Sequence, residues 1–399
     1  MSTATSEEPE TQSAHRHRAH AMDSATTVRG AAGMKGVLLP VLIVLGIGSI
    51  FVSVYLAAFH APAPHHLPVA VVGDERTLAG VERGLEHGQP GGFTVRGYAS
   101  ESEARTALHD RQVYAAYIAP GAGSASSAAG SGPSGAKAGT SANTSATTTV
   151  AAVANPAPSA GRSATGGPGT APELLYAGAN GSGVTATVTG AFGAVATAQG
   201  QQLTAHDVVP ASTGDSRGLS VFYAAFGVVL AGFLYGTMTY QLAPRLEYRL
   251  RMLSLGLFGA LGGLVVSLIG GHAFGAVPGP FLEVAVVVAL MATAAGGATM
   301  ALMRLFGPAG VMLSTIMLLI FGNATCGGVL PAPYLPDWLH PLHAILPVGA
   351  GVRAIQGVSY FRSDGLATGL IVLGLWTLVC TGVLYVRDVW SVRLLARTP

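Results

Sequence analysis

The chain carries little charge. Only 10% of its 399 residues are Asp, Glu, Lys or Arg, whereas a soluble domain carries about a quarter. Half of the residues are hydrophobic and 55 more are glycine, so we expect lipid to cover part of the folded surface. The formal net charge is +2, and no basic stripe with interleaved aromatics occurs. The composition argues against an ordinary cytosolic enzyme and against nucleic acid as a partner.

Cysteine is almost absent, which bears on metal and disulfide chemistry. Cys326 and Cys380 lie in apolar stretches and form no Cys-x-x-Cys pair, so neither a structural zinc site nor a disulfide-stapled domain is predicted. His65, His66 and His87 have no spacing that fixes a metal geometry. No nucleophile stands beside a matching base, so we expect no catalytic residue, no metal site and no enzyme activity.

Long apolar runs are abundant and predict six transmembrane helices. Residues 37–59 carry no charge and are long enough to cross a hydrocarbon core of about 30 Å. A cleaved signal peptide is the alternative, because Ala61-Pro62-Ala63 resembles a cleavage site, but the preceding stretch is too long for one. The other five helices are predicted at 219–241, 253–270, 281–303, 310–329 and 366–386.

The short flanks of these runs set the orientation, because arginine and lysine are retained on the cytoplasmic side. Most of the flanking arginines and lysines lie on the side of the membrane that holds both termini. The short loops on the opposite side carry only Arg353 and Arg362. Both tails, 1–36 and 387–399, are therefore expected in the cytoplasm, with 60–218 outside. Arginine greatly outnumbers lysine, and alanine, glycine and valine are abundant, which favours a bacterial plasma membrane.

The long segment between the first two predicted helices alternates strand-like and helical patterns. Strands are expected near 69–72, 93–98, 113–118, 174–177 and 203–209, with helices between them. Residues 121–170 are mostly Ala, Gly, Ser, Thr and Pro, too poor in large apolar groups to fold, so we expect a disordered insertion. The predicted fold is an α-helical polytopic membrane protein of one plus five spans, with a small α/β extracytoplasmic domain at 60–218.

Several residues near the predicted membrane boundaries are candidates for a transport path or for the membrane interface. Glu283 is either an interfacial carboxylate or part of a proton relay, the former being favoured. Tyr235 and Gln241 either line a path or lie among headgroups. Between the last two spans, prolines interrupt any continuous helix, so residues 330–363 are expected to form short outer helices that dip into the bilayer. Trp338 suits the interface there.

Glycines at four-residue spacing recur in three predicted helices, and such pairs let helix backbones approach closely. They lie at Gly232 and Gly236, Gly259 and Gly263, and Gly365 and Gly369. The pairs mark either packing within the chain, which we favour, or a dimer interface.

The stretch after the fifth predicted span carries a family resemblance. Gly327-Gly328-Val329-Leu330-Pro331 is followed by Leu335-Pro336-Asp337-Trp338-Leu339, and the run Leu342-His343-Ala344-Ile345-Leu346-Pro347 precedes Arg353 and Gly357. This pattern resembles the end of ABC-2 type permeases, and nearest to it the phage-infection-protein (Pip) subgroup. The layout of one span, a large outer domain and five spans is similar to that subgroup as well.

The resemblance implies the membrane subunit of an ATP-driven exporter for an amphiphilic or envelope-related substrate. The sequence contains no Gly-x-x-x-x-Gly-Lys-Ser/Thr phosphate loop, so we expect no cofactor on this chain and ATP use by a separate ABC ATPase. The expected partners are that ATPase, the bilayer, and a second copy or a paired permease. Contact with the ATPase is expected at Arg245, Glu247, Arg249 and Arg251, and a translocation path or gate at Tyr235, Gln241, Glu283, Pro331, Pro336, Trp338, Pro347 and Arg353.

Other interpretations remain open. The arginines at 245–251 could serve only to set the topology. The chain could also be a scaffold or receptor without transport activity, whose outer domain binds a surface or secreted partner. An ion-driven secondary transporter ranks third, because such proteins show acidic pairs and internal repeats, and neither is evident.

Overall fold

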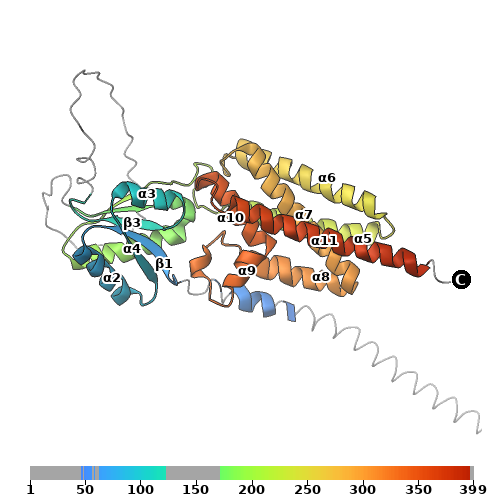
Figure 1. Ribbon diagram of the computed structural model, residues 1–399, viewed down its shortest axis with the longest axis horizontal. Coiled ribbons are helices and arrows are strands. Elements are labelled where there is room, and N and C mark those ends of the chain that lie inside the picture. Colours follow the sequence, from blue (N-terminus) through green and yellow to red (C-terminus); the bar gives the residue numbers. More distant parts are fainter. Residues whose placement is uncertain (1–45, 48, 56–57, 59–62, 123–170, 396–399) are drawn as a thin grey trace, which may run out of the picture.

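The computed structural model describes residues 46–47, 49–55, 58, 63–122 and 171–395, with side chains described up to residue 388. Two parts follow one another along the long axis (Figure 1). A β-sheet with its helices, here called the sheet region (Leu67–Asp207), lies at one end of a bundle of long helices, here called the bundle (Ser220–Leu395). The predicted N-terminal tail 1–36, and nearly all of the predicted insertion 121–170, lie outside the described residues.

The sheet has five strands in the order β2-β1-β3-β4-β5. Neighbouring strands are parallel except for β3 and β4, which pair antiparallel. A parallel sheet needs helices on both faces, because neither face can be left to water. The strands are β1 (Leu67–Val72), β2 (Phe93–Tyr98), β3 (Ala115–Ile118), β4 (Glu173–Tyr176) and β5 (Thr204–Asp207).

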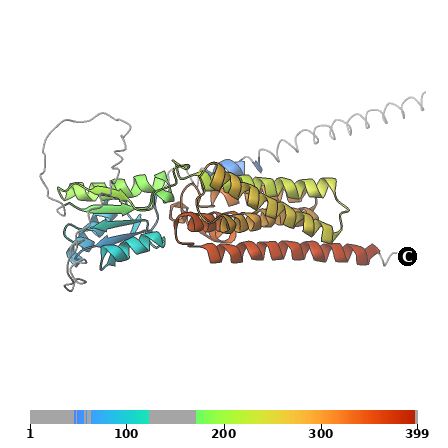
Figure 2. The same cartoon turned by 90° about the horizontal axis from the view of Figure 1, so that it is seen from above.

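Helices cover both faces of the sheet (Figure 2). Alternation along β1 explains the layering: Val69 and Val71 pack in one apolar cluster with α2 (Glu75–Gly88) and α4 (Ser182–Ala198). Ala70 and Val72 pack on the opposite side with α3 (Glu101–His109).

The start of α3 is fixed by a capping box. Ser100 Oγ accepts a hydrogen bond from the Glu103 amide at 3.3 Å, and Glu103 Oε2 accepts from the Ala99 amide at 3.2 Å. These bonds satisfy amides that the first helical turn leaves without partners. The strand-to-helix turn is therefore set locally by sequence.

Among the described residues, four helices are long and apolar enough to cross a membrane. Most of the apolar stretch of α7 is buried (61%), against 33% or less for the other three, so α7 is the central helix. The four are α5 (Ser220–Leu242), α6 (Tyr248–Ser267) with its π-helical extension Leu268–Ala273, α7 (Phe281–Phe306) and α11 (Leu366–Leu395).

The predicted count of six spans is not confirmed. Residues 37–59 lie mostly outside the described residues, although those described there are helical, and Val54 packs against Ile320. The predicted span 310–329 is a shorter apolar helix, Ala309–Gly322, made of α8 (Ala309–Ser314) and a π-helical segment. Gly327, with φ +75°, lies in the turn that follows and directs the chain away from the helix.

The proline-rich stretch 330–363 forms short helices that connect the two regions. It contains a 3₁₀ turn, Ala332–Tyr334, then α9 (His340–Ile345) and α10 (Pro347–Tyr360). Tyr334 is buried in the apolar cluster of α2 and α4, and Phe361 in that of α3. The sheet region and the bundle are therefore joined by shared apolar cores.

All three glycine pairs lie at contacts within the chain. A Cβ on Gly232 would come within 2.8 Å of Ala295 Cβ, one on Gly259 within 2.8 Å of the Ala289 carbonyl oxygen, and one on Gly369 within 2.7 Å of Ala354 Cβ. Such distances exclude a side chain. The pairs thus let α5 and α6 approach α7, and α11 approach α10, as the favoured interpretation predicts.

Candidate functional site

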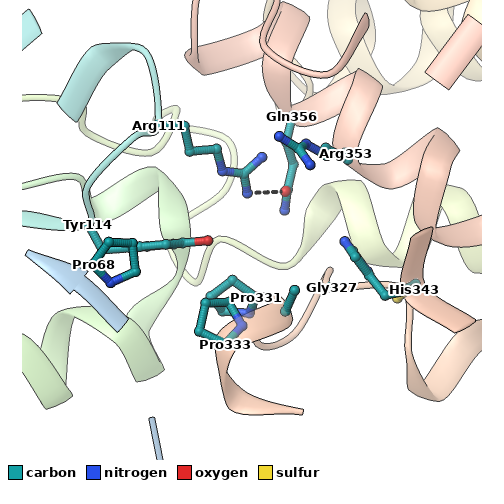
Figure 3. A pocket seen from close by; sticks show the side chains of 11 residues that line it. Pro68, Arg111, Tyr114, Gly327, Pro331, Pro333, His343, Arg353 and Gln356 are labelled. Atoms are coloured by element: carbon teal, nitrogen blue, oxygen red, sulfur yellow. Dashed lines mark hydrogen bonds between the residues drawn. The ribbon is translucent and has the colours of Figure 1, made fainter. Parts of the chain in front are cut away.

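A cavity of about 250 Å³ lies where the sheet region meets the bundle. Several segments contribute to it: the start of β1, the loop between α3 and β3, the turn at Cys326 and Gly327, the 3₁₀ turn around Ala332, and helices α9 and α10. In Figure 3, Arg111 and Gln356 meet at its upper edge, with Tyr114 and His343 on opposite sides. The lining residues are Pro68, Arg111, Tyr114, Cys326, Gly327, Pro331, Ala332, Pro333, His343, Arg353 and Gln356.

Arg111 enters the cavity because α3 ends in a sharp turn. Its backbone is left-handed, with φ +57°, and its amide bonds to the Leu108 carbonyl. This turn directs the side chain toward α10, where Arg111 Nη2 donates to Gln356 Oε1 at 2.6 Å. The guanidinium carbon lies 4.7 Å from the centroid of the Phe361 ring, a favourable cation–π distance.

The environment of Arg111 disfavours its charge. Burial lowers the pKa of Arg111, and nearby Tyr114 and Asp364 oppose that effect only in part. Arg111 Nε is buried and has no hydrogen-bond partner among the described residues. A buried donor without an acceptor is unfavourable, so the guanidinium of Arg111 is left incompletely hydrogen-bonded.

Arg353 supplies the second guanidinium from α10, one turn before Gln356, so both side chains lie on the same helix face. Its Nη2 contacts both carboxylate oxygens of Asp364 at 3.3 Å, and the side chain is 51% exposed. Gly365, with φ +75°, allows this placement: a Cβ there would come within 2.7 Å of Arg353 Cγ.

His343 holds the turn on the other side of the cavity. Its Nδ1 donates to the Thr325 carbonyl oxygen at 2.8 Å, since a carbonyl can only accept. Burial lowers the pKa of His343; the Thr325 bond opposes this, and the charges of Arg353 and Arg111 add to it. The imidazole is therefore neutral at neutral pH. Burial also raises the pKa of Tyr114, which keeps its phenol protonated.

The cavity is electropositive. Two arginines line it, together with the neutral His343, and none of its described lining residues is Asp or Glu. These groups offer ionic binding and hydrogen-bond donation, rather than a nucleophile activated by a base. Within the described part of the chain, no three His, Cys, Asp or Glu side chains cluster so that they could hold a metal ion.

A second charged cluster lies at the end of the bundle away from the sheet region. Arg251 Nη1 donates to Asp388 Oδ2 at 2.8 Å, and Arg304 Nη2 donates to Asp388 Oδ1 at 3.0 Å. Arg251 Nη2 also donates to the Leu246 carbonyl oxygen at 2.7 Å. The cluster therefore ties together α6, α7, α11 and the loop before α6.

The structure corrects the prediction for Arg251. Arg245, Glu247 and Arg249 are exposed, but Arg251 is only 3% exposed and lies inside the cluster. The helix also begins earlier than the predicted residue 253, at Tyr248, because Asp388 compensates the charge of Arg251 and allows it to be buried. Arg251 is thus not available at the surface.

The predicted path residues do not come together in one place. Pro331 and Arg353 line the cavity, and buried Pro347 begins α10. Pro336 is half-buried and Trp338 is exposed on the turn before α9. Glu283 is exposed in the first turn of α7, and Gln241 is exposed near the end of α5.

Tyr235 stacks on Phe258 and donates to Ser254 Oγ at 2.8 Å.

Sequence reasoning missed Arg111, His343 and Gln356 as site residues. The only signal for Arg111 is its place just before an apolar strand, and many surface arginines share that setting. The sequence signal for Gln356 is weak: it follows Arg353 by three residues, which places both on one helix face. Their convergence depends on how α3 and α10 dock, which no local pattern reports.

One family model, that of ABC-2 family transporter proteins, matches residues 36–386. The chain belongs to this family. The match covers both the sheet region and the bundle, so the ABC-2 assignment applies to nearly the whole chain. No curated protein and no solved structure is detectably similar to it. With the apolar helices, the family makes the chain a multi-pass membrane permease subunit, generally non-catalytic and typically paired with an ABC ATPase.

Proposed function

We propose that the chain is the permease subunit of an ATP-driven exporter in a bacterial plasma membrane, within the phage-infection-protein subgroup. It moves an amphiphilic or envelope-related substrate outward. In this proposal the chain has six spans with both termini in the cytoplasm. The sheet region is a small α/β extracytoplasmic domain, the insertion 121–170 lies outside, and residues 330–363 dip into the outer leaflet.

The observation that carries this proposal is the construction of the loop between α5 and α6. The loop exposes Arg245 and Glu247, and Arg249 follows on the exposed face of α6. Immediately behind it, buried Arg251 bonds to the Leu246 carbonyl and to Asp388. A force applied to the loop would be transmitted to α6, α7 and α11 through these bonds. Arginines that served only to orient the chain in the membrane would not need bonds that tie their loop to the helices.

The partner in this proposal is an ABC ATPase that binds the loop and uses the ATP. The chain supplies the membrane path as a homodimer or with a paired permease. The cavity beside Arg353 lies at the opposite end of the bundle, which is the exit side in this orientation. The rival proposal, a scaffold that binds an outer partner, requires no ATPase.

Co-purification tests the proposal. The full chain would be purified in mild detergent from its native host, and co-eluting proteins and vanadate-sensitive ATPase activity would be measured. We expect a stoichiometric ABC ATPase, reduced at least about tenfold by the double variant Arg245→Gln/Arg249→Gln. Arg217→Gln removes a similarly exposed arginine before α5, at the other end of the bundle, and serves as the control.

Two outcomes would contradict the proposal. One is association that persists in the double variant, which would remove the loop from the contact. The other is reproducible capture of surface or secreted proteins with no ATPase, which would favour the scaffold.

A further inference from the structure

We propose that the cavity between the sheet region and the bundle binds a phosphate-type anion, held by the guanidinium groups of Arg111 and Arg353. This inference rests on the proposed export function in one respect: the anion is taken to be the headgroup of the transported amphiphile. It thereby names a substrate class that neither the family nor the topology specifies.

The first argument is the balance of charge. The cavity is lined by two arginines, whereas its described lining includes no carboxylate. Asp364 is the carboxylate near both arginines: it bonds to Arg353 Nη2 at 3.3 Å, and its charge also acts on Arg111 without a hydrogen bond. Arg111 receives only the neutral Gln356 amide oxygen and the face of Phe361. Two arginines therefore share one nearby carboxylate, and a bound anion would compensate the remaining positive charge.

The second argument is the unsatisfied donor. Arg111 Nε is shielded from solvent and has no acceptor among the described residues. Arginine presents its N–H groups in a planar fork that matches phosphate oxygens. An oxyanion in the cavity would accept from this fork. Burial lowers the pKa of Arg111, and the negative charge of the same anion would raise it again.

The third argument is arrangement and size. Arg111, Tyr114 and Arg353 reach the space from different directions (Figure 3), which suits an anion with several oxygens. The volume, about 250 Å³, falls just below the range of about 300–1000 Å³ typical of drug-sized ligands. The cavity therefore fits a headgroup, and the acyl chains of an amphiphile would remain outside it.

The cavity lies between the sheet region and the bundle, so a bound anion would link the two. Arg111 belongs to the sheet region and Arg353 to the bundle, so one anion would contact both. Rigid prolines, Pro331 and Pro333, border the same space and limit how far it can collapse when empty. Binding would thus stabilise the junction between the two regions.

A binding experiment on the full chain tests this inference without any ATPase. The protein is placed in phosphatidylcholine nanodiscs and titrated with inorganic phosphate against chloride of equal ionic strength, with the unfolding temperature as readout. In a second arm, native mass spectrometry counts phosphatidylglycerol molecules retained from mixed nanodiscs. The variants are Arg111→Gln and Arg353→Gln. The control is Arg105→Gln on α3, which removes an arginine paired with Glu101 outside the cavity.

We expect binding in at least one arm, weakened about tenfold or more by each cavity variant and unchanged by the control. A response to inorganic phosphate alone identifies a free anion as the ligand, and one to phosphatidylglycerol alone identifies a lipid headgroup. Arg353 is half-exposed, so its variant is expected to fold even if Arg111→Gln does not. Absence of binding in both arms, or binding that Arg353→Gln leaves intact, overturns the inference. Failure of an ATPase to co-purify would overturn the exporter alone.

Discussion

Arg251 and Asp388 form a 2.8 Å ion pair that joins the start of α6 to α11 across 137 residues of sequence. The arginine side chain is only 4% exposed, and the same carboxylate accepts from Arg304. One acidic side chain therefore compensates two cations at the end of three helices. The arrangement places a structural anchor directly behind the exposed loop that we propose for ATPase contact.

Replacing Asp388 with Asn should destabilise the bundle. The change leaves Arg251 buried without a counter-charge, and removing one partner of a buried pair costs about 3–5 kcal/mol. We expect the lower end of that range, because Arg251 retains its bond to the Leu246 carbonyl. Denaturant unfolding of the purified protein would measure it. Glu283→Gln removes an exposed carboxylate and should change little; equal effects of the two variants would contradict the assignment.

Truncating Phe361 should weaken the junction between the two regions. Its ring is fully buried in the α3 cluster and lies under the Arg111 guanidinium. Phe361→Ala should cost about 3–5 kcal/mol of unfolding free energy, since it removes a buried aromatic and leaves a cavity. Phe274, 69% exposed, provides the matched control. If limited proteolysis detects no loosening of the sheet region in Phe361→Ala, the shared core is not what joins the two regions.

Two glycines of α6 should respond oppositely to the same substitution. A methyl group on Gly259 would meet the Thr293 side chain and the Ala289 carbonyl, whereas Gly256 has no heavy atom within 4 Å of that position. Gly259→Ala should therefore destabilise by about 1–3 kcal/mol through overpacking. Gly256→Ala should be neutral or stabilise by up to about 1 kcal/mol, because alanine favours the helix. Thermal unfolding of both variants in one detergent compares them, and a stable Gly259→Ala would refute close packing of α6 on α7.

His343 should make stability fall in mild acid. Burial lowers its pKa in the folded protein below the value of about 6.5 of an unfolded chain. Below about pH 6.5 the unfolded state therefore binds more protons than the folded state. The stability that neutral His343 contributes is complete above that pH and is lost as the pH falls. We expect the unfolding temperature to drop between pH 7.5 and pH 5.5, and His343→Gln to reduce that drop. An unchanged pH profile in the variant would assign the acid sensitivity elsewhere.

The local elements of the sheet region follow closely from sequence. β1 and β2 lie where the apolar runs 69–72 and 93–98 predict strands, and Val184, Val188, Phe192 and Val195 are all buried on one face of α4. These elements are predictable because each depends on periodicity or capping within a few residues. The start of α6 is different, because Arg249 and Arg251 resemble a charged loop in the sequence, and only the contact of Arg251 with Asp388 explains why a helix can begin there.

The sequence by itself determined that this chain belongs in a membrane, since 10% charge and long apolar runs leave no other solvent for it. It also marked the close helix contacts, because closely packed backbones require glycine at fixed spacing. Only the tertiary structure decided which charges are buried and where a cavity forms. Arg111 and Gln356 lie 245 residues apart and meet at 2.6 Å. The burial of Phe361, which directly follows α10, in the apolar cluster of α3 brings them together, and no local pattern assigns Phe361 to that partner.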